Sequence, residues 1–383
     1  MTRIDAPWIR SPEVQAVCAM LTQAGHQALF VGGCVRNALL GAGISDIDIS
    51  TDARPERVME LAAQAGLKAV PTGIDHGTVT VIADGQPFEV TTFRRDVETD
   101  GRRAVVAFAD GVDEDAHRRD FTMNALYATP EGAVLDPLGG LPDLQARRVR
   151  FIDAAEARIR EDYLRILRYF RFHAWYGDPE NGFDPEALAA CAALSAGLET
   201  LSKERIGAEV KKLLAAPDPA PSVATMAQAG ILRRILPGAD PRALPILTAF
   251  EAATDLPSDP IRRLAALTGP ECADLLRLSR DETRALAALR DAATGTASPQ
   301  ALGYRLGADV ARDAVLLRAS LLESPLPAGW PQDIATGAAV EFPVKARDLM
   351  PDYKGPALGA KLAELEDRWI ASGFTLDKDA LLH

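Results

Sequence analysis

The chain of 383 residues is too long for one ordinary hydrophobic core, so we expect two to four domains. With 48% hydrophobic and 25% charged residues, its composition is that of a soluble globular protein. No apolar run approaches membrane-spanning length and the first residues hold no apolar segment typical of a signal peptide, so we predict a cytoplasmic protein without a membrane partner. The four cysteines are scattered singly, which indicates neither a zinc site nor a disulfide framework. The net charge of −12 argues against bulk attraction to nucleic acid, but not against a local strip of Lys and Arg that binds phosphates.

The first part of the chain predicts a helix, a strand and a second helix. Residues 12–24 have an amphipathic helical pattern, and the short apolar run 28–31 indicates a buried strand. A glycine pair, Gly32 and Gly33, then leads into a helical segment at 35–40. A helix that starts directly after a glycine turn offers free backbone N–H groups to an anion.

One arginine and two aspartates follow the glycine pair. Arg36 lies in the first turn of this second helix, which breaks at Gly41. A strand is predicted at 46–49, where Asp46 and Asp48 alternate with isoleucines and therefore share one face. Two carboxylates that face a glycine turn and a helix N-terminus suit a divalent cation holding a nucleoside triphosphate.

Each of these features alone is weak, because a lone D-x-D is most often a solvated strand end and a lone Gly-Gly is most often a turn. Together, in the order strand, Gly-Gly-x-x-Arg, helix, Gly, D-x-D, they resemble the nucleotidyltransferase signature of the class II CCA-adding enzymes and bacterial poly(A) polymerases. The resemblance implies that the glycines and Arg36 approach the triphosphate and that Asp46 and Asp48 bind catalytic Mg²⁺. The family usually has Asp after the arginine, where this chain has Asn37. We expect the loss of that carboxylate to loosen Arg36 without removing catalysis.

Downstream segments complete a small sheet. A helix at 56–65 and strands at 68–71, 78–82 and 88–94 alternate apolar and polar residues, which fits a sheet covered by helices on one face. Glu89 lies on the last of these strands. It is either a third catalytic carboxylate or an ordinary solvated strand residue, and it is not assigned a role here.

Two further segments lie before the end of the predicted head. Residues 95–112, rich in Asp, Gly and Arg, predict a mobile loop with a short strand, and in the resembling family a flexible loop here serves the switch from C to A addition. Residues 117–126 match the family motif R-R-D-F-T-x-N-A, with a helix expected from near Phe121. An isolated Arg-Arg-Asp run would indicate a surface ion pair. The resemblance implies instead that Arg119 contacts nucleotide, and its planar guanidinium suits phosphate or ribose oxygens.

Residues 160–172 predict a helix with an apolar side. Asp162 and Arg165 lie one turn apart, which in isolation indicates an intrahelical ion pair. The segment matches the family's E-D-x-x-R-x-x-R-x-x-R, and the resemblance implies that Asp162 and Arg165 select the incoming base while Arg168 and Arg171 also contact nucleotide. A carboxylate accepts from the exocyclic amine of cytosine or adenine and a guanidinium donates to the adjacent ring nitrogen, whereas guanine and uracil present the opposite pattern.

From about residue 183 the pattern is helical, and its Lys and Arg residues either face tRNA or form a solvated helix face. The resemblance therefore implies an α/β nucleotidyltransferase head, like that of polymerase beta with a small sheet and helices, followed by an all-α neck, body and tail. The predicted bounds are 1–150 for the head, 151–215 for the helical neck with the base-selecting helix, 216–325 for the body and 326–383 for the tail.

The predicted activity is template-independent addition of C, C and A to the 3′ end of tRNA from CTP and ATP, with release of pyrophosphate, Mg²⁺ as cofactor and no protein partner. Alternatives are a poly(A) polymerase or a partial CC- or A-adding enzyme, because the head motifs do not separate these activities. A more distant alternative is a non-catalytic RNA-binding protein on the same scaffold. The predicted catalytic and metal-binding residues are Asp46 and Asp48, and the predicted nucleotide-binding residues are Gly32, Gly33, Arg36, Arg119, Asp162, Arg165, Arg168 and Arg171.

Overall fold

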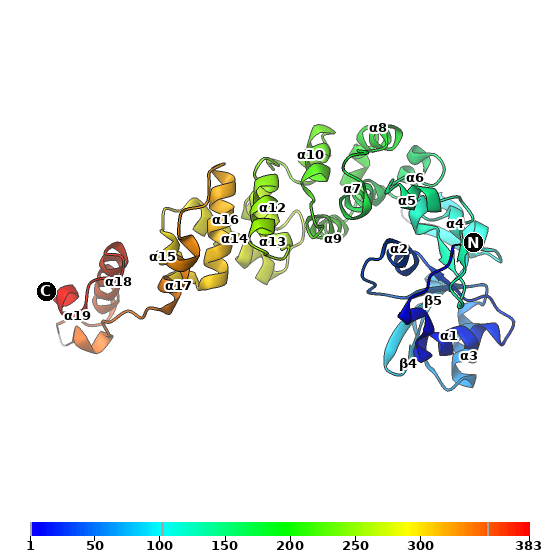
Figure 1. Ribbon diagram of the computed structural model, residues 1–383, viewed down its shortest axis with the longest axis horizontal. Coiled ribbons are helices and arrows are strands. Elements are labelled where there is room, and N and C mark those ends of the chain that lie inside the picture. Colours follow the sequence, from blue (N-terminus) through cyan, green and yellow to red (C-terminus); the bar gives the residue numbers. More distant parts are fainter. Residues whose placement is uncertain (1, 101–102, 351) are drawn as a thin grey trace. The chain divides into compact units, whose positions relative to one another are not determined.

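The computed structural model describes residues 2–100, 103–350 and 352–383 (Figure 1). The chain divides into two compact units. Unit 1 comprises Met1–Glu209 with Thr225–Ile235, and unit 2 comprises Val210–Ala224 with Leu236–His383. All the predicted site residues therefore belong to unit 1.

Unit 1 contains a seven-stranded mixed sheet with the strand order β3-β4-β5-β2-β1-β8-β9. Its strands are β1 (Leu29–Val31), β2 (Asp48–Thr51), β3 (Lys68–Gly73), β4 (Thr78–Ala83), β5 (Gln86–Thr92), β8 (Tyr127–Ala128) and β9 (Val134–Leu135). β2 and β5 pair in parallel, whereas the other neighbours are antiparallel. In β4 the side chains of Val79, Val81 and Ala83 are buried while the intervening residues are partly exposed, as expected for a sheet with one packed face. The small α/β head predicted from the sequence is confirmed, and its sheet is mixed.

Helices cover this sheet and continue the chain beyond it. The helices that lie wholly or partly in unit 1 are α1 (Pro12–Thr22), α2 (Gly33–Leu40), α3 (Pro55–Gln64), α4 (Val112–His117), α5 (Leu141–Gln145), α6 (Ala155–Glu161), α7 (Leu164–Tyr176), α8 (Pro185–Ala193), α9 (Lys203–Leu214), α10 (Ala220–Gln228) and α11 (Leu232–Ile235), with 3-10 turns at Pro7–Arg10, Ile74–His76, Thr122–Asn124 and Ser195–Thr200. α1 begins with Pro12 in its first turn, and the Ser11 hydroxyl accepts the Val14 N–H at 3.4 Å. α1 and α3 pack against each other and against β4 and β5 (Figure 1).

Unit 2 is helical over its described residues, so the predicted helical remainder is confirmed. Besides parts of α9 and α10, its helices are α12 (Ala243–Ala253), α13 (Pro260–Leu267), α14 (Arg280–Thr294), α15 (Pro299–Leu306), α16 (Ala308–Leu321), α17 (Trp330–Ala339), α18 (Pro356–Ala371) and α19 (Lys378–Leu382), with 3-10 turns at Pro270–Cys272 and Ala346–Asp348. In the described part of the chain, no helix has both the length and the apolar character needed to cross a membrane.

Residues 95–112 were predicted to form a loop with a short strand, but most of this segment forms two paired strands. β6 (Arg94–Asp100) and β7 (Arg103–Phe108) pair as an antiparallel ribbon, and residues 101–102 of the predicted loop lie outside the described residues. The helix expected from near Phe121 is also wrong, because only a single 3-10 turn follows that residue.

The continuous helix predicted over residues 160–172 is interrupted at Asp162, whose φ of −154° and ψ of 105° are extended. α6 ends just before this residue and α7 begins two residues after it. The Asp162 carboxylate accepts the backbone N–H of Leu164 at 3.1 Å, and the Asp162 carbonyl accepts the N–H of Arg165 at 3.0 Å. An aspartate that bonds to nearby backbone competes with helical hydrogen bonding, so this side chain favours the break between α6 and α7.

Candidate active site

Unit 1 contains a cavity of about 330 Å³ that brings three distant motifs together. Eight of the ten predicted site residues line it: Gly32, Gly33, Arg36, Asp48, Arg119, Asp162, Arg165 and Arg168. Asp120, Asn124 and Phe172 complete the lining. The two predicted residues outside this lining are Asp46 and Arg171.

The glycine turn brings the backbone close to an arginine. Gly32 precedes α2 with a φ of 71°, a conformation that residues with a side chain rarely adopt. A Cβ atom there would lie 3.5 Å from Nη1 of Arg119. The turn thus directs the N-terminus of α2, whose first N–H groups have no intrahelical acceptor, toward the cavity that Gly32 and Gly33 line. Free N–H groups and the helix dipole both favour an anion at this position.

The Arg36 side chain is buried and held by neutral partners. Nε and Nη2 both donate to Oδ1 of Asn37, at 3.1 and 3.0 Å. Nη1 donates to Oδ1 of Asn124 at 2.6 Å, and Nη2 also donates to the Tyr176 hydroxyl at 2.8 Å. The expected loosening of Arg36 by Asn37 is therefore wrong, because the amide oxygen binds the guanidinium in the way a carboxylate oxygen would.

The sequence predicted Asp46 and Asp48 on one strand, but only Asp48 lies on it. β2 begins at Asp48, so Asp46 precedes the strand and is exposed, with the Ser45 hydroxyl donating to it at 2.9 Å. Both aspartates, together with Glu89, line a second cavity of about 630 Å³. Asp48 lines both cavities and is the register partner of Glu89 in the parallel β2–β5 pair.

The charges around Asp48 fit a bound cation. Burial raises the pKa of the Asp48 carboxyl above its usual value, and the nearby charges of Glu89 and Asp46 raise it further while Arg119 opposes them. Among the described residues, no group of three or more His, Cys, Asp or Glu side chains is arranged as a complete metal site. Magnesium commonly binds one or two carboxylates and takes its other ligands from water and substrate phosphates, so an incomplete protein site is compatible with it.

Arg119 is anchored from the side opposite Gly32. Its guanidinium donates to the Asp115 carboxylate at 2.9 Å and to the Tyr127 hydroxyl at 3.1 Å, and that hydroxyl donates to the same carboxylate at 2.8 Å. Burial alone would raise the pKa of the Asp115 carboxyl, but Arg119 and Tyr127 bring it below its usual value. These contacts fix Arg119 in place at the edge of the cavity.

The base-selecting pair predicted at 162 and 165 lines the cavity, and each member is oriented by other residues. Asp162 Oδ2 accepts from Arg205 Nη2 at 2.7 Å. Arg165 donates from Nη1 to the Arg158 carbonyl at 2.8 Å and from Nη2 to the Arg118 carbonyl at 3.2 Å, and it also pairs with Glu161. Asp162 and Arg165 are therefore each held by other residues, and the intrahelical ion pair between them that the isolated sequence indicated is not formed.

Arg168 and Arg171, the later arginines of the motif, both pair with Glu209, which lies 4.0 Å from Nη1 of Arg168, but they form their shortest hydrogen bonds with different carboxylates. Arg168 Nε donates to Asp120 at 2.6 Å, whereas Arg171 Nε donates to Glu209 at 2.6 Å. Asp120 also accepts from Asn124 at 2.9 Å, so hydrogen bonds run without a break from Arg36 through Asn124 and Asp120 to Arg168. Burial would raise the pKa of the Asp120 carboxyl, but Arg168 and the hydrogen bonds that this carboxylate accepts lower it.

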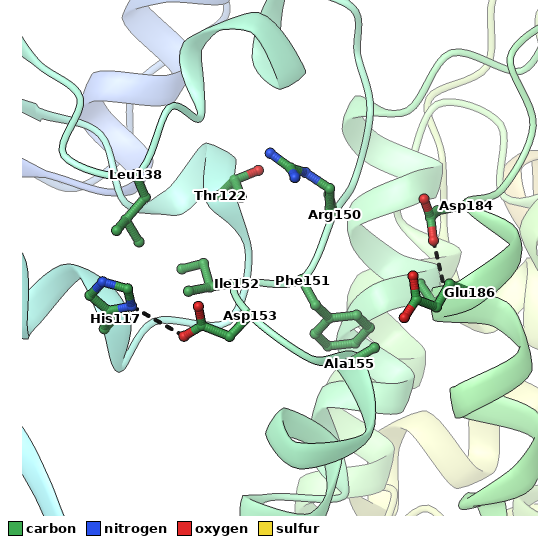
Figure 2. A pocket seen from close by; sticks show the side chains of 11 residues that line it. His117, Thr122, Leu138, Arg150, Phe151, Ile152, Asp153, Ala155, Asp184 and Glu186 are labelled. Carbon is green, nitrogen blue, oxygen red and sulfur yellow. Dashed lines mark hydrogen bonds and ion pairs between the residues drawn. The ribbon is translucent and has the colours of Figure 1, made fainter.

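Sequence reasoning did not assign Asp120, Asn124, Arg205 and Glu209 to the site. Asp120 and Asn124 stand inside the R-R-D-F-T-x-N-A match, which was the available signal, whereas nothing local marks Arg205 or Glu209 as neighbours of the base-selecting segment. Unit 1 also has a cavity of about 400 Å³ that none of the predicted residues lines. Figure 2 shows its lining, with His117 3.1 Å from Asp153.

The comparisons with known proteins agree with this architecture. Residues 28–150 match the family model described as the poly A polymerase head domain, and residues 182–242 match the one described as a probable RNA and SrmB-binding site of polymerase A. The mixed sheet, the glycine turn and the carboxylates beside it define the class of the protein as a nucleotidyltransferase. Enzymes of this class generally use a divalent metal ion.

The relatives identify the family within that class. The chain is 30% identical over 411 residues to mitochondrial CCA tRNA nucleotidyltransferase 1 of Homo sapiens, with 98% of this chain and 92% of the human protein covered. It is 40% identical over 230 residues to the CCA-adding enzyme of Leuconostoc citreum (strain KM20), which covers 59% of this chain and 55% of that protein. The crystal structure of the Bacillus stearothermophilus CCA-adding enzyme in complex with CTP has a TM-score of 0.74 and 26% identity, covering 94% of both chains. The chain belongs to the CCA tRNA nucleotidyltransferase family.

Proposed function

We propose that this protein adds C, C and A to the 3′ end of tRNA without a nucleic-acid template, using CTP and ATP and releasing pyrophosphate. The observation that carries the proposal is the 330 Å³ cavity, where a helix N-terminus and two arginines suited to a triphosphate share one lining with Asp162 and Arg165. A site of this composition can bind a nucleotide by its phosphates and select its base. We further propose the cytoplasm as its compartment, which cell fractionation would test.

The phosphate side of the proposed site consists of Gly32, Gly33, Arg36 and Arg119. Their N–H groups would orient the triphosphate, and positioning with charge neutralisation carries most of the chemistry of such a transfer. Asp46 and Asp48 would hold Mg²⁺. When bound, the ion would lower the pKa of the attacking 3′-hydroxyl and neutralise charge on the leaving pyrophosphate.

The base side of the proposed site has unused hydrogen-bonding capacity. The Asp162 carboxylate offers about four lone-pair positions. The Leu164 N–H and Arg205 occupy two of these, so acceptors remain for the exocyclic amine of cytosine or adenine. The bonds of Arg165 to two carbonyl groups and Glu161 leave its Nε–H and one Nη2–H for a ring nitrogen. Arg168 and Arg171 would complete the nucleotide contacts in the proposed neck, residues 151–215, between a head at 1–150 and a body and tail at 216–325 and 326–383.

The decisive experiment supplies tRNA that lacks its 3′ CCA with CTP and ATP, separately and together, in the presence of Mg²⁺. We expect two cytidines with CTP alone and complete CCA with both nucleotides. Long adenosine tails from ATP alone would instead show a poly(A) polymerase, and products that stop at CC or require a preformed CC end would show a partial enzyme. If no nucleotide is incorporated, the remaining alternative is a non-catalytic RNA-binding protein.

Asp162→Ala is expected to relax base choice. Removing the acceptor for the exocyclic amine should reduce the ratio of kcat/KM for CTP over UTP by about tenfold or more, since a lost polar contact to the substrate is worth roughly 1–3 kcal/mol. Because alanine also removes the oxygen that accepts the N–H of Leu164, the first residue of α7, Asp162→Asn serves as the second variant that keeps an accepting oxygen. Unchanged discrimination in both variants would refute the base-selecting role.

Arg205→Ala is expected to raise KM for CTP and ATP together by about threefold to tenfold, because Asp162 loses the guanidinium that orients it. Stability should change by less than about 1 kcal/mol, since the Arg205 and Asp162 side chains are 47% and 34% exposed. Arg57→Ala, which breaks an exposed Arg–Glu pair elsewhere in unit 1, is the matched control. Steady-state kinetics in which both variants match the wild type would contradict this role for Arg205.

A further inference from the structure

Tyr163 lies between the two residues proposed to select the base. Asp162 has an extended backbone, and Tyr163, with a φ of −60° and a ψ of −16°, is the residue directly before α7. The Tyr163 carbonyl accepts the N–H of Ile166 at 3.1 Å, and the Asp162 carbonyl accepts that of Arg165. Asp162 and Arg165 line the cavity of about 330 Å³, whereas Tyr163 does not. A displacement of Tyr163 would therefore move both residues without removing any atom from the cavity.

The Tyr163 ring packs against Gly197, where the structure leaves no room for a side chain. A Cβ atom at Gly197 would lie 2.0 Å from Cδ1, 2.1 Å from Cε1 and 2.4 Å from Cγ of Tyr163. Carbon atoms in ordinary contact are about 3.5–4.0 Å apart, so the ring or the backbone would have to move by more than about 1 Å. Rotation of the ring alone does not relieve the contact, because Cγ is bonded directly to the Cβ of Tyr163. The φ of Gly197 is not positive, so the glycine is needed for space and not for its backbone conformation.

The turn that contains Gly197 is held in place by an arginine. Gly197 belongs to the 3-10 turn Ser195–Thr200. Arg234, in α11, donates to the Ser195 hydroxyl at 3.1 Å and to the Glu199 carboxylate at 2.9 Å. Because these two bonds lie on either side of Gly197, a side chain added there would displace the aromatic ring more readily than the turn.

The chain that follows this turn also contacts Asp162. Arg205, in α9, donates to Asp162 Oδ2 at 2.7 Å. Gly197 and Arg205 therefore contact the neighbouring residues Tyr163 and Asp162, so one stretch of chain supports the base-selecting segment at two points. The ion pair is partly exposed, with side chains 47% and 34% accessible, and solvent weakens it. The ring contact depends on shape instead, because close-packed atoms do not yield to a change in volume.

We propose that the contact between the Tyr163 ring and Gly197 sets the base selectivity of this protein, because it fixes where the residues on either side of Tyr163 lie. Both are positioning residues, since neither lines the cavity. The proposal rests on the proposed function, in which Asp162 and Arg165 contact the base. The phosphate side of that site comes from α2 and Arg119, so disturbing the ring contact should reduce selectivity and leave phosphate binding intact.

The selectivity of Gly197→Ala tests the proposal. We expect its ratio of kcat/KM for CTP over UTP to fall by about fivefold or more, because misplaced polar groups lose part of their hydrogen bonding to the base. Inhibition by pyrophosphate, which has no base, should be unchanged. The matched control is Gly359→Ala in α18, where a Cβ atom would meet no atom within 4 Å, and its ratio should equal that of the wild type.

A double variant separates the ring contact from a general effect on the fold. Tyr163→Ala should itself reduce the ratio, because the ring that fixes the segment is gone. Adding Gly197→Ala to it should cause no further loss, since the added Cβ atom no longer meets the ring, and the two substitutions should be non-additive. Tyr163→Phe keeps the ring and should retain the wild-type ratio.

The proposal is overturned if Gly197→Ala keeps the wild-type ratio, if its kcat/KM falls equally for every nucleotide, if pyrophosphate inhibition weakens, or if the two single losses add in the double variant. If Gly197→Ala does not fold, the Tyr163 variants decide. A reduced ratio in Tyr163→Ala with the wild-type ratio in Tyr163→Phe supports the proposal, and any other pattern refutes it. A wild type that incorporates no nucleotide would reject the proposed function itself, whereas an active wild type whose selectivity depends on Asp162 but not on Gly197 rejects only this inference.

Discussion

Replacing Asp48 with alanine is expected to lower nucleotide incorporation by on the order of 10³-fold while leaving the protein folded. Asp48 lines both the cavity that contains Arg36 and Arg119 and the one that contains Asp46 and Glu89, and we propose that its carboxylate would hold the metal ion beside the bound nucleotide. Alanine would remove this proposed metal ligand. Asp46→Ala is expected to abolish transfer in the same way.

The fold should tolerate the loss of Asp48 because its charge is not stabilised by the protein. Burial and Glu89 raise the pKa of this carboxyl, so ionising it costs more free energy in the folded chain than in the unfolded chain. Alanine is therefore expected to leave the midpoint of thermal unfolding unchanged or slightly higher. Initial rates at saturating CTP, tRNA and Mg²⁺ measure the loss of nucleotide incorporation. The control is Glu60→Ala on the exposed face of α3. Activity within tenfold of the wild type would show that the metal assignment is wrong.

Replacing Glu251 with alanine is expected to destabilise unit 2 by about 3–5 kcal/mol. Glu251 is 2% exposed and accepts from Nε of Arg262 and of Arg263, each at 2.8 Å, while the two arginines are 3% exposed. Arg263 also donates to the Leu214 carbonyl at 2.7 Å, so the cluster joins α12, α13 and the end of α9. Removing the one carboxylate that both arginines share leaves two buried cations, and Asp313 remains as a partner for Arg262 only.

Urea unfolding followed by a signal specific to unit 2 measures this effect. The matched control is Asp367→Ala, which breaks the pair with Arg305 at 2.7 Å where the side chains are 69% and 50% exposed. The control is expected to cost less than about 1 kcal/mol. Glu251→Gln keeps the side-chain volume and one acceptor, so its loss should be intermediate. If Glu251→Ala costs no more than Asp367→Ala, the buried cluster does not stabilise the unit.

The sequence predicted which segments meet at the cavity better than how their side chains are held. Gly32, Arg119 and Asp162 come from three motifs, and each lines the same cavity. Motif matching could place them because the residue types and their spacing within each motif already specify a phosphate or base contact. The sheet and the helical remainder followed from hydrophobic periodicity, which reports on which residues of an element are buried.

The failures concern contacts between residues far apart in the chain or between a side chain and its own backbone. The partner of Asp162 is Arg205, 43 residues later, and the partner of Arg168 is Asp120, 48 residues earlier. Periodicity within a window of a few residues carries no information about such pairs. The break at Asp162 was missed because apolar spacing continues through it, whereas the backbone conformation is set by a side-chain hydrogen bond.

The dual role of Asp162 has a practical consequence for changing nucleotide preference. The side chain proposed to discriminate between bases also accepts the N–H of Leu164, the first residue of the helix that carries Arg165 and Arg168. A substitution chosen only for its match to another base would therefore loosen the first turn of that helix and displace its arginines. Engineered libraries for unnatural nucleotides would be best restricted at this position to Asn, Ser and Thr, the short polar residues that can also accept a backbone N–H two residues later.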